Sequence, residues 1–247
     1  MQPYCAKSVS IVTPVYNECG VIEDVIRSVD REILQYLKDF EFIVAEDGSS
    51  DGTRQILRKL EKEIPIRLVC SEKRKGYAKA LKDALSLAKN EIVFFLDSDG
   101  QHQVADFWKL LPFIDDFDLV TGYKCPRHDG KFRLFISRVM NSLVFFMFGC
   151  FFRDINSGFK LFRKPSLDIL LESCEGMDFI SIELLLKAFL RKMAIAEVPV
   201  IHFQRKFGES RGLPAAKLPI KALGLLADLI RMKLRLFFLQ KGAVNIK

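Results

Sequence analysis

Short, mainly apolar runs alternate with longer amphipathic segments along the first half of the chain. The runs predict buried strands and lie at 9–12, 42–45, 66–69, 92–96 and 119–120. The segments between them have the spacing of helices with charged outer faces and lie at 21–38, 51–63, 76–89 and 103–115. This alternation predicts an α/β fold with a doubly wound, mostly parallel sheet and helices on both faces. Because ligands of such sheets bind beyond the carboxyl ends of the strands, the loops after the strands are the expected binding region.

The pattern changes after residue 122. A basic loop leads into a Phe-rich helix over about 132–150, followed by an extended piece at 158–163 and a helix near 179–192. A strand ending at Pro199 then leads to a basic, glycine-containing loop at 205–212. A final amphipathic helix is predicted over about 215–240. We expect these elements to extend the core of the first half.

Composition and charge divide the chain in the same way. The 247 residues are 49% hydrophobic and include 22 Phe, which is enough for one sizeable core and excludes a disordered protein. The net charge of +7 is uneven, because residues 1–119 carry 16 basic and 21 acidic groups and residues 120–247 carry 22 and 10. This asymmetry suggests a metal in the first half and an anionic partner in the second. Nucleic acid is not the expected partner, since no nucleic-acid-binding motif is found.

The cysteine and hydropathy patterns bear on the compartment. The six cysteines lie at least 14 residues apart with no Cys-x-x-Cys pair, which is typical of reduced thiols in a cytosolic protein. No signal peptide is expected, because strand-like sequence starts at Ser8. The longest apolar run, Leu143 to Phe152, has ten residues, whereas a spanning helix needs about 20. We therefore expect a protein that touches a membrane without crossing it.

Two loops of the first half suggest a nucleotide pocket. The loop after the first strand contains Pro14, Tyr16 and Glu18, and the loop after the second begins with Glu46 and Asp47. An aromatic ring at 16 has the shape to stack on a nucleobase, and a carboxylate at 47 can accept a hydrogen bond from a ring N–H. The alternative for the second loop is an Asp-Gly-Ser turn that only caps a helix.

The loop after the 92–96 strand contains two close carboxylates, Asp97 and Asp99, separated by Ser98. Such carboxylates repel each other unless a cation or a network of donors lies between them. Mg²⁺ takes one or two carboxylates together with substrate phosphates, so this pattern suggests a metal–diphosphate site. A helix-capping turn is the alternative. We expect His102 to be exposed to solvent. A role for His102 as a further metal ligand is a less favoured alternative.

At this point the motifs resemble a known family. Pro-x-Tyr-Asn-Glu from Pro14, Asp-Gly-Ser-x-Asp-Gly-Thr from Asp47, and Asp-x-Asp 50 residues further on resemble the family 2 glycosyltransferases, which have the Rossmann-like GT-A fold. The stretches 154–160 and 205–211 resemble two motifs of the polyprenyl-phosphate branch, Asp-x-x-Ser-Gly-Phe-Arg and Arg-x-x-Gly-x-Ser-Lys. The resemblance runs from about Ser8 to Arg211 and is nearest to dolichyl-phosphate mannose synthase and its bacterial and archaeal relatives.

The resemblance assigns roles to individual residues. The implied nucleotide-sugar site consists of Pro14, Tyr16, Glu18, Ala45, Asp47, Asp97, Ser98, Asp99, Lys124, Arg205 and Arg211. The implied ligands of Mg²⁺ or Mn²⁺ are Asp97, Asp99 and Gln101, and the implied catalytic residues are Asp99, Asp154 and Arg205. For Asp154 a structural cap on the 157–158 turn is the alternative. The chain departs from the pattern with Lys at 124 for Arg, Arg at 211 for Lys, and Glu at 46 for the more usual Asp.

The activity that the resemblance implies is metal-dependent transfer of one hexose, with inversion. The donor would be GDP-mannose or a UDP-hexose, and the acceptor a dolichyl or undecaprenyl monophosphate. Transfer to another acceptor by a non-processive enzyme, and a non-catalytic nucleotide-sugar-binding homologue, are the alternatives. A processive polysaccharide synthase is disfavoured, because the sole tryptophan, Trp108, is not in a Gln-x-x-Arg-Trp motif. No Gly-x-Gly-x-x-Gly follows the first strand and no Gly-Lys-Ser/Thr occurs, which argues against a dehydrogenase and a Walker-type NTPase.

These expectations define an organisation and a location. Residues 1–212 would form the GT-A domain, with a nucleotide-sugar half at 8–122 and an acceptor half at 123–212, and residues 213–247 a membrane-interface helix. The final helix has a basic arc and an apolar side, although a helix that faces the core would have a similar pattern. We expect a monotopic protein on the cytoplasmic face of a membrane, with an integral-membrane subunit as a candidate partner.

Overall fold

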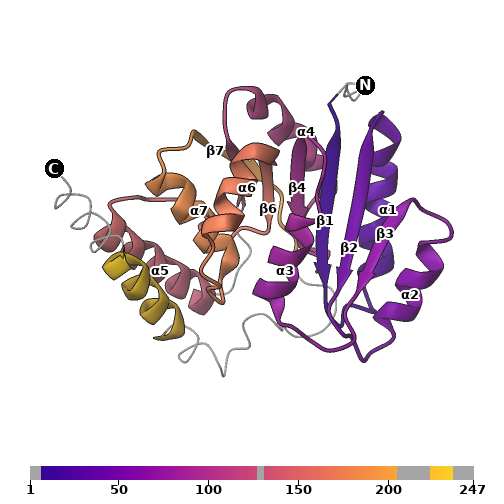
Figure 1. Cartoon of the computed structure of the whole chain (residues 1–247), viewed down its shortest axis with the longest axis horizontal. Coiled ribbons are helices and arrows are strands. Elements are labelled where there is room, and N and C mark those ends of the chain that lie inside the picture. The colour runs from indigo at the N-terminus through magenta and orange to yellow at the C-terminus, as the bar shows by residue number, and fades with distance from the viewer. Residues whose placement is uncertain (1–6, 127–130, 205–222, 236–247) are drawn as a thin grey trace.

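The structure of this chain is a computed structural model that describes residues 7–126, 131–204 and 223–235, without the side chains of 131–136. Its centre is a seven-stranded sheet with the order β3-β2-β1-β4-β6-β5-β7 (Figure 1). The strands are β1 (Val9–Val15), β2 (Phe40–Glu46), β3 (Ile66–Cys70), β4 (Ile92–Leu96), β5 (Leu119–Lys124), β6 (Phe159–Arg163) and β7 (Ile195–Val200). The predicted mostly parallel sheet is confirmed, since only β6 runs against its neighbours.

Helices cover both faces of this sheet, as predicted (Figure 1). The α-helices are α1 (Ile22–Glu32), α2 (Thr53–Leu60), α3 (Tyr77–Ser86), α4 (Phe107–Leu110), α5 (Lys131–Phe148), α6 (Lys164–Ser173) and α7 (Ile180–Leu190). The short 3₁₀ helices are η1 (Leu34–Tyr36), η2 (Val104–Asp106) and η3 (Leu111–Asp115). A further helix occupies residues 223–235.

Alternate strand residues enter two separate cores. Phe42 and Val44 of β2 pack with α1, α2 and α4 on one face. Ile43 and Ala45 pack with α3, α5, α6, α7 and the 223–235 helix on the other. Because side chains point to opposite faces along a strand, a run buried on both sides is apolar at nearly every position. The continuous apolar runs in the sequence have this physical origin.

The structure differs from the prediction at three places. The single helix expected over 103–115 is divided into η2, α4 and η3, and Pro112, which cannot continue an α-helix, lies in the last of these. Helix α6 was not predicted, although Pro165 at its first turn is a known start signal. Strand β6 was expected only as an extended piece, and it separates β4 from β5.

The 223–235 helix has two apolar stripes where the sequence suggested one. Leu225, Leu229 and Met232 are buried in the core that α3, α5, α6 and α7 share. Leu223, Ile230 and Leu234 belong to the predicted apolar side, and they are exposed. The core-facing alternative therefore holds for one stripe of this helix and not for the other. Within the described part of the chain, no helix has both the length and the hydropathy to cross a bilayer.

Candidate functional site

The predicted loops meet at one edge of the sheet. Strands β1, β2, β4, β5 and β7 end at this edge, and the antiparallel β6 begins there. The register pairs Pro14 with Ala45, and the Asp47 N–H continues the ladder by donating to the Val15 carbonyl at 2.9 Å. The ends of β1 and β2 thus bring four of the predicted nucleotide-site residues, Pro14, Tyr16, Ala45 and Asp47, next to one another.

Hydrogen bonds join the first loop to the second. Asn17 has a φ of 54° and its Oδ1 accepts the Ser50 N–H at 2.7 Å, while the Asn17 N–H donates to the Ser49 hydroxyl at 2.9 Å. The Glu18 N–H donates to Thr53 Oγ1 at 2.9 Å. The two motifs found separately in the sequence therefore form one braced unit, in which Glu18 is fixed through its backbone.

The second loop is also a cap. Asp51, which lies outside the Asp-Gly-Ser turn, accepts the Thr53 N–H at 3.1 Å at the start of α2, whereas Asp47 of that turn accepts N–H groups at the start of α3. Glu46, whose exchange for Asp had no explanation in the sequence, is fully buried. Its carboxylate accepts the Ser49 N–H and a bond from Arg54 Nε at 2.6 Å. Glu46 therefore neutralises Arg54 and holds the turn.

Asp47 is almost fully buried, and its contacts differ from those expected. Oδ1 accepts the Lys75 N–H at 2.7 Å and Oδ2 accepts the Gly76 N–H at 2.9 Å. The carboxylate thus ties the end of β2 to the start of α3. This scaffold role was not visible in the sequence, because the partners are backbone groups 28 and 29 residues away.

The ring of Tyr16 is in contact with a cationic side chain. The Arg74 guanidinium lies 4.1 Å from the ring centroid, a distance typical of a cation–π contact. Gly48, in the neighbouring loop, has a φ of 71°, and a Cβ there would lie 2.8 Å from the Arg74 backbone nitrogen. The glycine of the Asp-Gly-Ser motif therefore allows the 71–76 segment to approach. This segment covers the aromatic ring that the sequence singled out.

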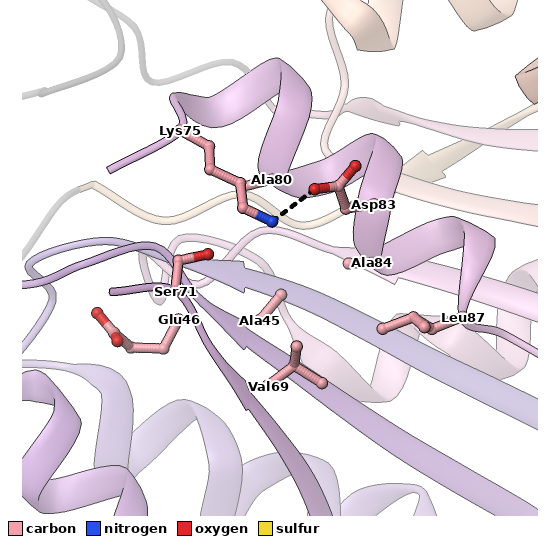
Figure 2. Close-up of a pocket in the computed structure, with 9 residues that line it drawn as sticks. All are labelled: Ala45, Glu46, Val69, Ser71, Lys75, Ala80, Asp83, Ala84 and Leu87. Atoms are coloured by element: carbon pink, nitrogen blue, oxygen red, sulfur yellow. Dashed lines mark hydrogen bonds and ion pairs between the residues drawn. The ribbon is translucent and has the colours of Figure 1, made fainter. Parts of the chain in front are cut away.

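A cavity opens beside this loop, between the ends of β2 and β3 and helix α3 (Figure 2). It is small, with a volume of about 20 Å³, and is lined by Ala45, Glu46, Val69, Ser71, Lys75, Ala80, Asp83, Ala84 and Leu87. Figure 2 shows Lys75 and Asp83 paired on the α3 side, with Nζ and Oδ2 2.7 Å apart. Three of the lining residues are alanines, and their small side chains leave the space between the helix and the sheet.

The Asp-x-Asp motif follows β4 directly. The Asp97 N–H donates to the Gly158 carbonyl at 2.9 Å, and the Tyr77 hydroxyl donates to Asp97 Oδ1 at 2.8 Å. Burial and the neighbouring Asp99 carboxylate raise the pKa of Asp97 to about 7. Gly158 packs so closely that a Cβ at this position would lie 1.7 Å from Asp97 Oδ2. Two partners distant in sequence thus confine one carboxylate.

The chemistry of these side chains fits a hard divalent cation. Asp97 and Asp99 offer carboxylate oxygens, and Mg²⁺ or Mn²⁺ can complete its shell with phosphate oxygens and water. No cluster of three or more His, Cys, Asp or Glu ligands occurs within the described ranges. Gln101, the third predicted ligand, donates its side-chain amide to the Phe203 carbonyl at 3.0 Å. Its backbone N–H donates to Asp99 Oδ1 at 3.1 Å.

His102 is buried, so the expectation that it is solvated is wrong. It forms an isolated β-bridge with His202, and the two rings lie 4.9 Å apart in an edge-to-face arrangement. Burial, with His202 nearby, holds the pKa of His102 well below its usual value. Sequence reasoning missed His202, which reaches the site because β7 ends at this edge of the sheet.

The turn before β6 introduces charge into the interior. Asp154 is nearly buried, and its Oδ2 has no hydrogen-bond partner among the described residues. Lys160 is fully buried and donates to the Ser157 carbonyl and, at 2.7 Å, to the Ser181 hydroxyl. Burial lowers the pKa of Lys160 to about 8, while Asp154 and Asp97 oppose that change. Sequence reasoning gave no role to Lys160, although it ends the 154–160 motif, or to Tyr77, which belongs to none of the recognised motifs.

The remaining predicted residues divide into two groups. Ser98 is buried between the two carboxylates, and Lys124 ends β5 at the same edge of the sheet. Arg205 and Arg211 lie outside the described residues, as does the 205–212 loop. The structure thus gathers at one sheet edge every predicted site residue that it describes.

Comparison with known sequences identifies the family. The sequence profile of glycosyl transferase family 2 matches residues 10–171, well over half of the chain, so the chain belongs to this family. It is 28% identical over 233 residues to the undecaprenyl-phosphate 4-deoxy-4-formamido-L-arabinose transferase of Pseudomonas fluorescens, covering 93% of this chain and 66% of that protein. It is 29% identical over 208 residues to the Salmonella choleraesuis transferase of the same name, covering 83% and 62%. The chain thus spans somewhat less than two thirds of the length of these relatives.

Solved structures support the fold. The glucosyl-3-phosphoglycerate synthase of Mycobacterium tuberculosis, in complex with phosphoglyceric acid, superposes with a TM-score of 0.71 at 21% identity, covering 92% of this chain and 80% of that one. A complex of the same enzyme with Mn²⁺, UDP and glucosyl-3-phosphoglycerate gives a TM-score of 0.69 at 21% identity, with the same coverage. The predicted GT-A fold is therefore confirmed.

Proposed function

We propose that this protein transfers a single hexose from a nucleotide diphosphate sugar to a polyprenyl monophosphate. The observation that carries the proposal is the carboxylate pair after β4, of which Asp97 is confined by Tyr77 and Gly158, at the carboxyl edge of the sheet. The relatives named as undecaprenyl-phosphate transferases support the acceptor. The solved structure with UDP and Mn²⁺ supports a uridine nucleotide and a divalent metal, with GDP-mannose as the other candidate donor.

The residues have distinct roles in this proposal. Asp97 and Asp99 would hold the cation and, through it, the donor diphosphate, and Gln101 is the third candidate ligand. When bound, the cation would neutralise the charge that develops on the leaving diphosphate. Lys124 adds positive charge at the same edge of the sheet. Arg205 and Arg211 are proposed to bind the donor phosphates with their guanidinium groups.

The acceptor supplies its own nucleophile. A lipid phosphate oxygen is already ionised near neutral pH, so the reaction does not require a general base. Asp154 is buried near the turn before β6, and its role in this proposal is to orient the acceptor. A single in-line displacement at the anomeric carbon inverts its configuration.

A panel of nucleotide sugars tests the proposal. Purified protein is incubated with UDP-glucose, other UDP-hexoses or GDP-mannose, undecaprenyl phosphate and Mg²⁺ or Mn²⁺, and lipid-linked sugar is counted. We expect product with at least one donor, and Asp99→Ala should lower its rate by about a thousandfold while the folded structure is retained. Asp116→Ala, at an exposed carboxylate on another loop, serves as the matched control. Wild-type activity of Asp99→Ala in excess metal would overturn the metal assignment.

The same panel separates the alternatives. The solved neighbour is named a glucosyl-3-phosphoglycerate synthase, which makes a soluble phosphorylated acceptor the second candidate. Product with 3-phosphoglycerate and none with undecaprenyl phosphate would establish that alternative. Binding of a UDP-sugar without product from either acceptor would indicate a non-catalytic homologue.

We also propose that the protein docks on the cytoplasmic leaflet of a membrane through α5 and the 223–235 helix. Phe146 and Phe151 are 83% and 67% exposed, and the outward stripe of the 223–235 helix adds Leu223 and Leu234. The two helices lie side by side, joined where Lys233 Nζ donates to the Met147 carbonyl at 2.5 Å (Figure 1). Exposed apolar surface of this kind is typical of a contact site.

Charge favours lipid as the partner. Residues 131–153 contain four basic groups and no acidic one, and Arg138 and Arg153 are exposed. Each basic side chain near an anionic leaflet contributes about 1 kcal/mol of attraction. A polyprenyl acceptor also keeps its tail in the bilayer, so the active site must approach the membrane surface.

Vesicle flotation tests this docking. The full chain should float with vesicles containing anionic lipid, and the double variant Phe146→Ser, Phe151→Ser should lose most of that binding. Phe113→Ser, at an exposed phenylalanine of η3, is the matched control and should float like the wild type. Equal flotation of the double variant and the wild type would overturn this docking surface.

A further inference from the structure

One short segment holds two carboxylates that the sequence placed in separate motifs. The N–H groups of Lys75 and Gly76 donate to Asp47 at 2.7 and 2.9 Å. The next residue, Tyr77, donates its hydroxyl to Asp97 Oδ1 at 2.8 Å. The 75–77 segment thus connects the nucleotide loop after β2 with the carboxylate pair after β4.

The backbone conformation of the 75–77 segment makes these contacts possible. Gly76 has a φ of 93°, a conformation that L residues rarely adopt, and this lets two successive N–H groups reach one carboxylate. Lys75 Nζ pairs with Asp83 Oδ2 at 2.7 Å, which ties the segment to the first turns of α3 (Figure 2). The segment is therefore anchored at both ends before it reaches Asp97.

Asp97 is confined from two sides. Tyr77 bonds one carboxylate oxygen, and Gly158 leaves no room for even a Cβ beside the other. Tyr77 as a whole residue is 43% exposed, so a large part of its surface does not pack in the core. Its hydroxyl nevertheless reaches inward to a carboxylate. The contact thus fixes the orientation of Asp97 more than it stabilises the fold.

We propose that Tyr77 is a positioning residue for the cation site. Its hydroxyl holds the Asp97 carboxylate in the orientation in which Asp97 and Asp99 bind one divalent cation. Through Gly76 and Lys75 the same segment links that orientation to the loop at Asp47. The inference rests on the proposed function in placing a cation at this pair, and it adds a residue that none of the recognised motifs contains.

Tyr77→Phe tests the proposal, because it removes only the hydroxyl. Binding of MnCl₂ is followed by the EPR signal of free Mn²⁺, with and without UDP, which measures the site without catalysis. Loss of a hydrogen bond to an ionised group should raise the Mn²⁺ dissociation constant by about tenfold. Excess Mn²⁺ should restore most of kcat, since the residue does not touch the substrate in this proposal.

Two further variants complete the experiment. Tyr36→Phe, at a ring that packs on Trp108 with centroids 6.1 Å apart, is the matched control and should bind Mn²⁺ like the wild type. Gly76→Ala strains the segment itself and should weaken UDP binding even without metal, which Tyr77→Phe should not do. Circular dichroism confirms that each variant is folded.

The outcomes separate this inference from the function on which it rests. Unchanged Mn²⁺ affinity in Tyr77→Phe, with binding intact in the wild type, would overturn the positioning role alone. Tighter binding would also overturn it, because Tyr77 would then compete with the cation for Asp97. Absence of Mn²⁺ binding in the wild type, with UDP present, would overturn the cation site and this inference together.

Discussion

The two halves of the molecule hold their buried charges in different ways. In residues 7–126 the site carboxylates are held by neutral donors, as at Asp47, which accepts two backbone N–H groups, and Asp97, which accepts the Tyr77 hydroxyl. The described residues from 131 to 235 instead contain two buried lysines, Lys160 and Lys187. Lys187 lies 3.2 Å from the Glu183 carboxylate, whereas Lys160 donates to the Ser157 carbonyl and the Ser181 hydroxyl.

This difference shows how the site is divided between the halves. The first half orients Asp47 and Asp97 through neutral donors of the 75–77 segment and leaves their negative charge available to a cation. The second half inserts β6 beside β4 and brings Gly158 and Lys160 against that charge. Neither half forms the site alone, because the carboxylates come from one and part of their confinement from the other.

The largest expected effect comes from breaking the contact between the halves at Gly158. In Gly158→Ala the new methyl group would overlap Asp97, and the carboxylate must move. Since displacement of a reacting group by about 1 Å can cost 10²-fold, we expect the transfer rate to fall by more than about a hundredfold. Steady-state assays and Mn²⁺ binding measure this loss.

The control for this variant is Gly224→Ala. Gly224 lies in the 223–235 helix with no atom within 4 Å of an added Cβ, so the activity should remain at the wild-type level. If Gly158→Ala were as active as this control, β6 would not confine Asp97.

The pH dependence of stability tests the buried cation of the second half. The pKa of Lys160 is lowered from 10.5 to about 8, so between these values the unfolded chain binds a proton that the folded chain does not. Stability then rises with pH across this window. Relative to Lys160→Met, the unfolding free energy of the wild type should gain on the order of 3 kcal/mol from pH 8 to 10.5.

Urea unfolding at several pH values measures that gain. Lys160→Arg should show no such rise, because a guanidinium stays protonated throughout the window. If the unfolding free energies of the wild type and Lys160→Met change with pH in the same way, burial does not lower the pKa of Lys160.

A smaller effect is expected from the ion pair that braces the nucleotide loop. The Glu46 side chain is fully buried, whereas Arg54 is 30% exposed. Arg54→Ala leaves the carboxylate without its cation and should lower the unfolding free energy by about 2 kcal/mol, below the range for fully buried pairs. Thermal unfolding checks this value against Arg58→Ala, an exposed neighbour on α2 that should have little effect.

Much of the first half followed from local sequence. Each of the first four predicted strands lies within an observed strand, because both faces of the sheet are covered and the runs are therefore continuously apolar. The loops at Pro14, Asp47 and Asp97 followed as well, since parallel strands must all end at one edge. The family resemblance and the GT-A fold were recognisable from these motifs and were confirmed.

The tertiary structure alone decided which distant groups meet. The order of strands that places β6 between β4 and β5, the bond from Tyr77 to Asp97, and the pairing of His102 with His202 all join residues 20 to 100 positions apart. A hydropathy pattern records whether a side chain prefers the interior, and it does not record which partner it meets there. For the same reason the sequence showed that the last helix is amphipathic, and only packing decided that Leu225 faces the core while Leu223 faces outward.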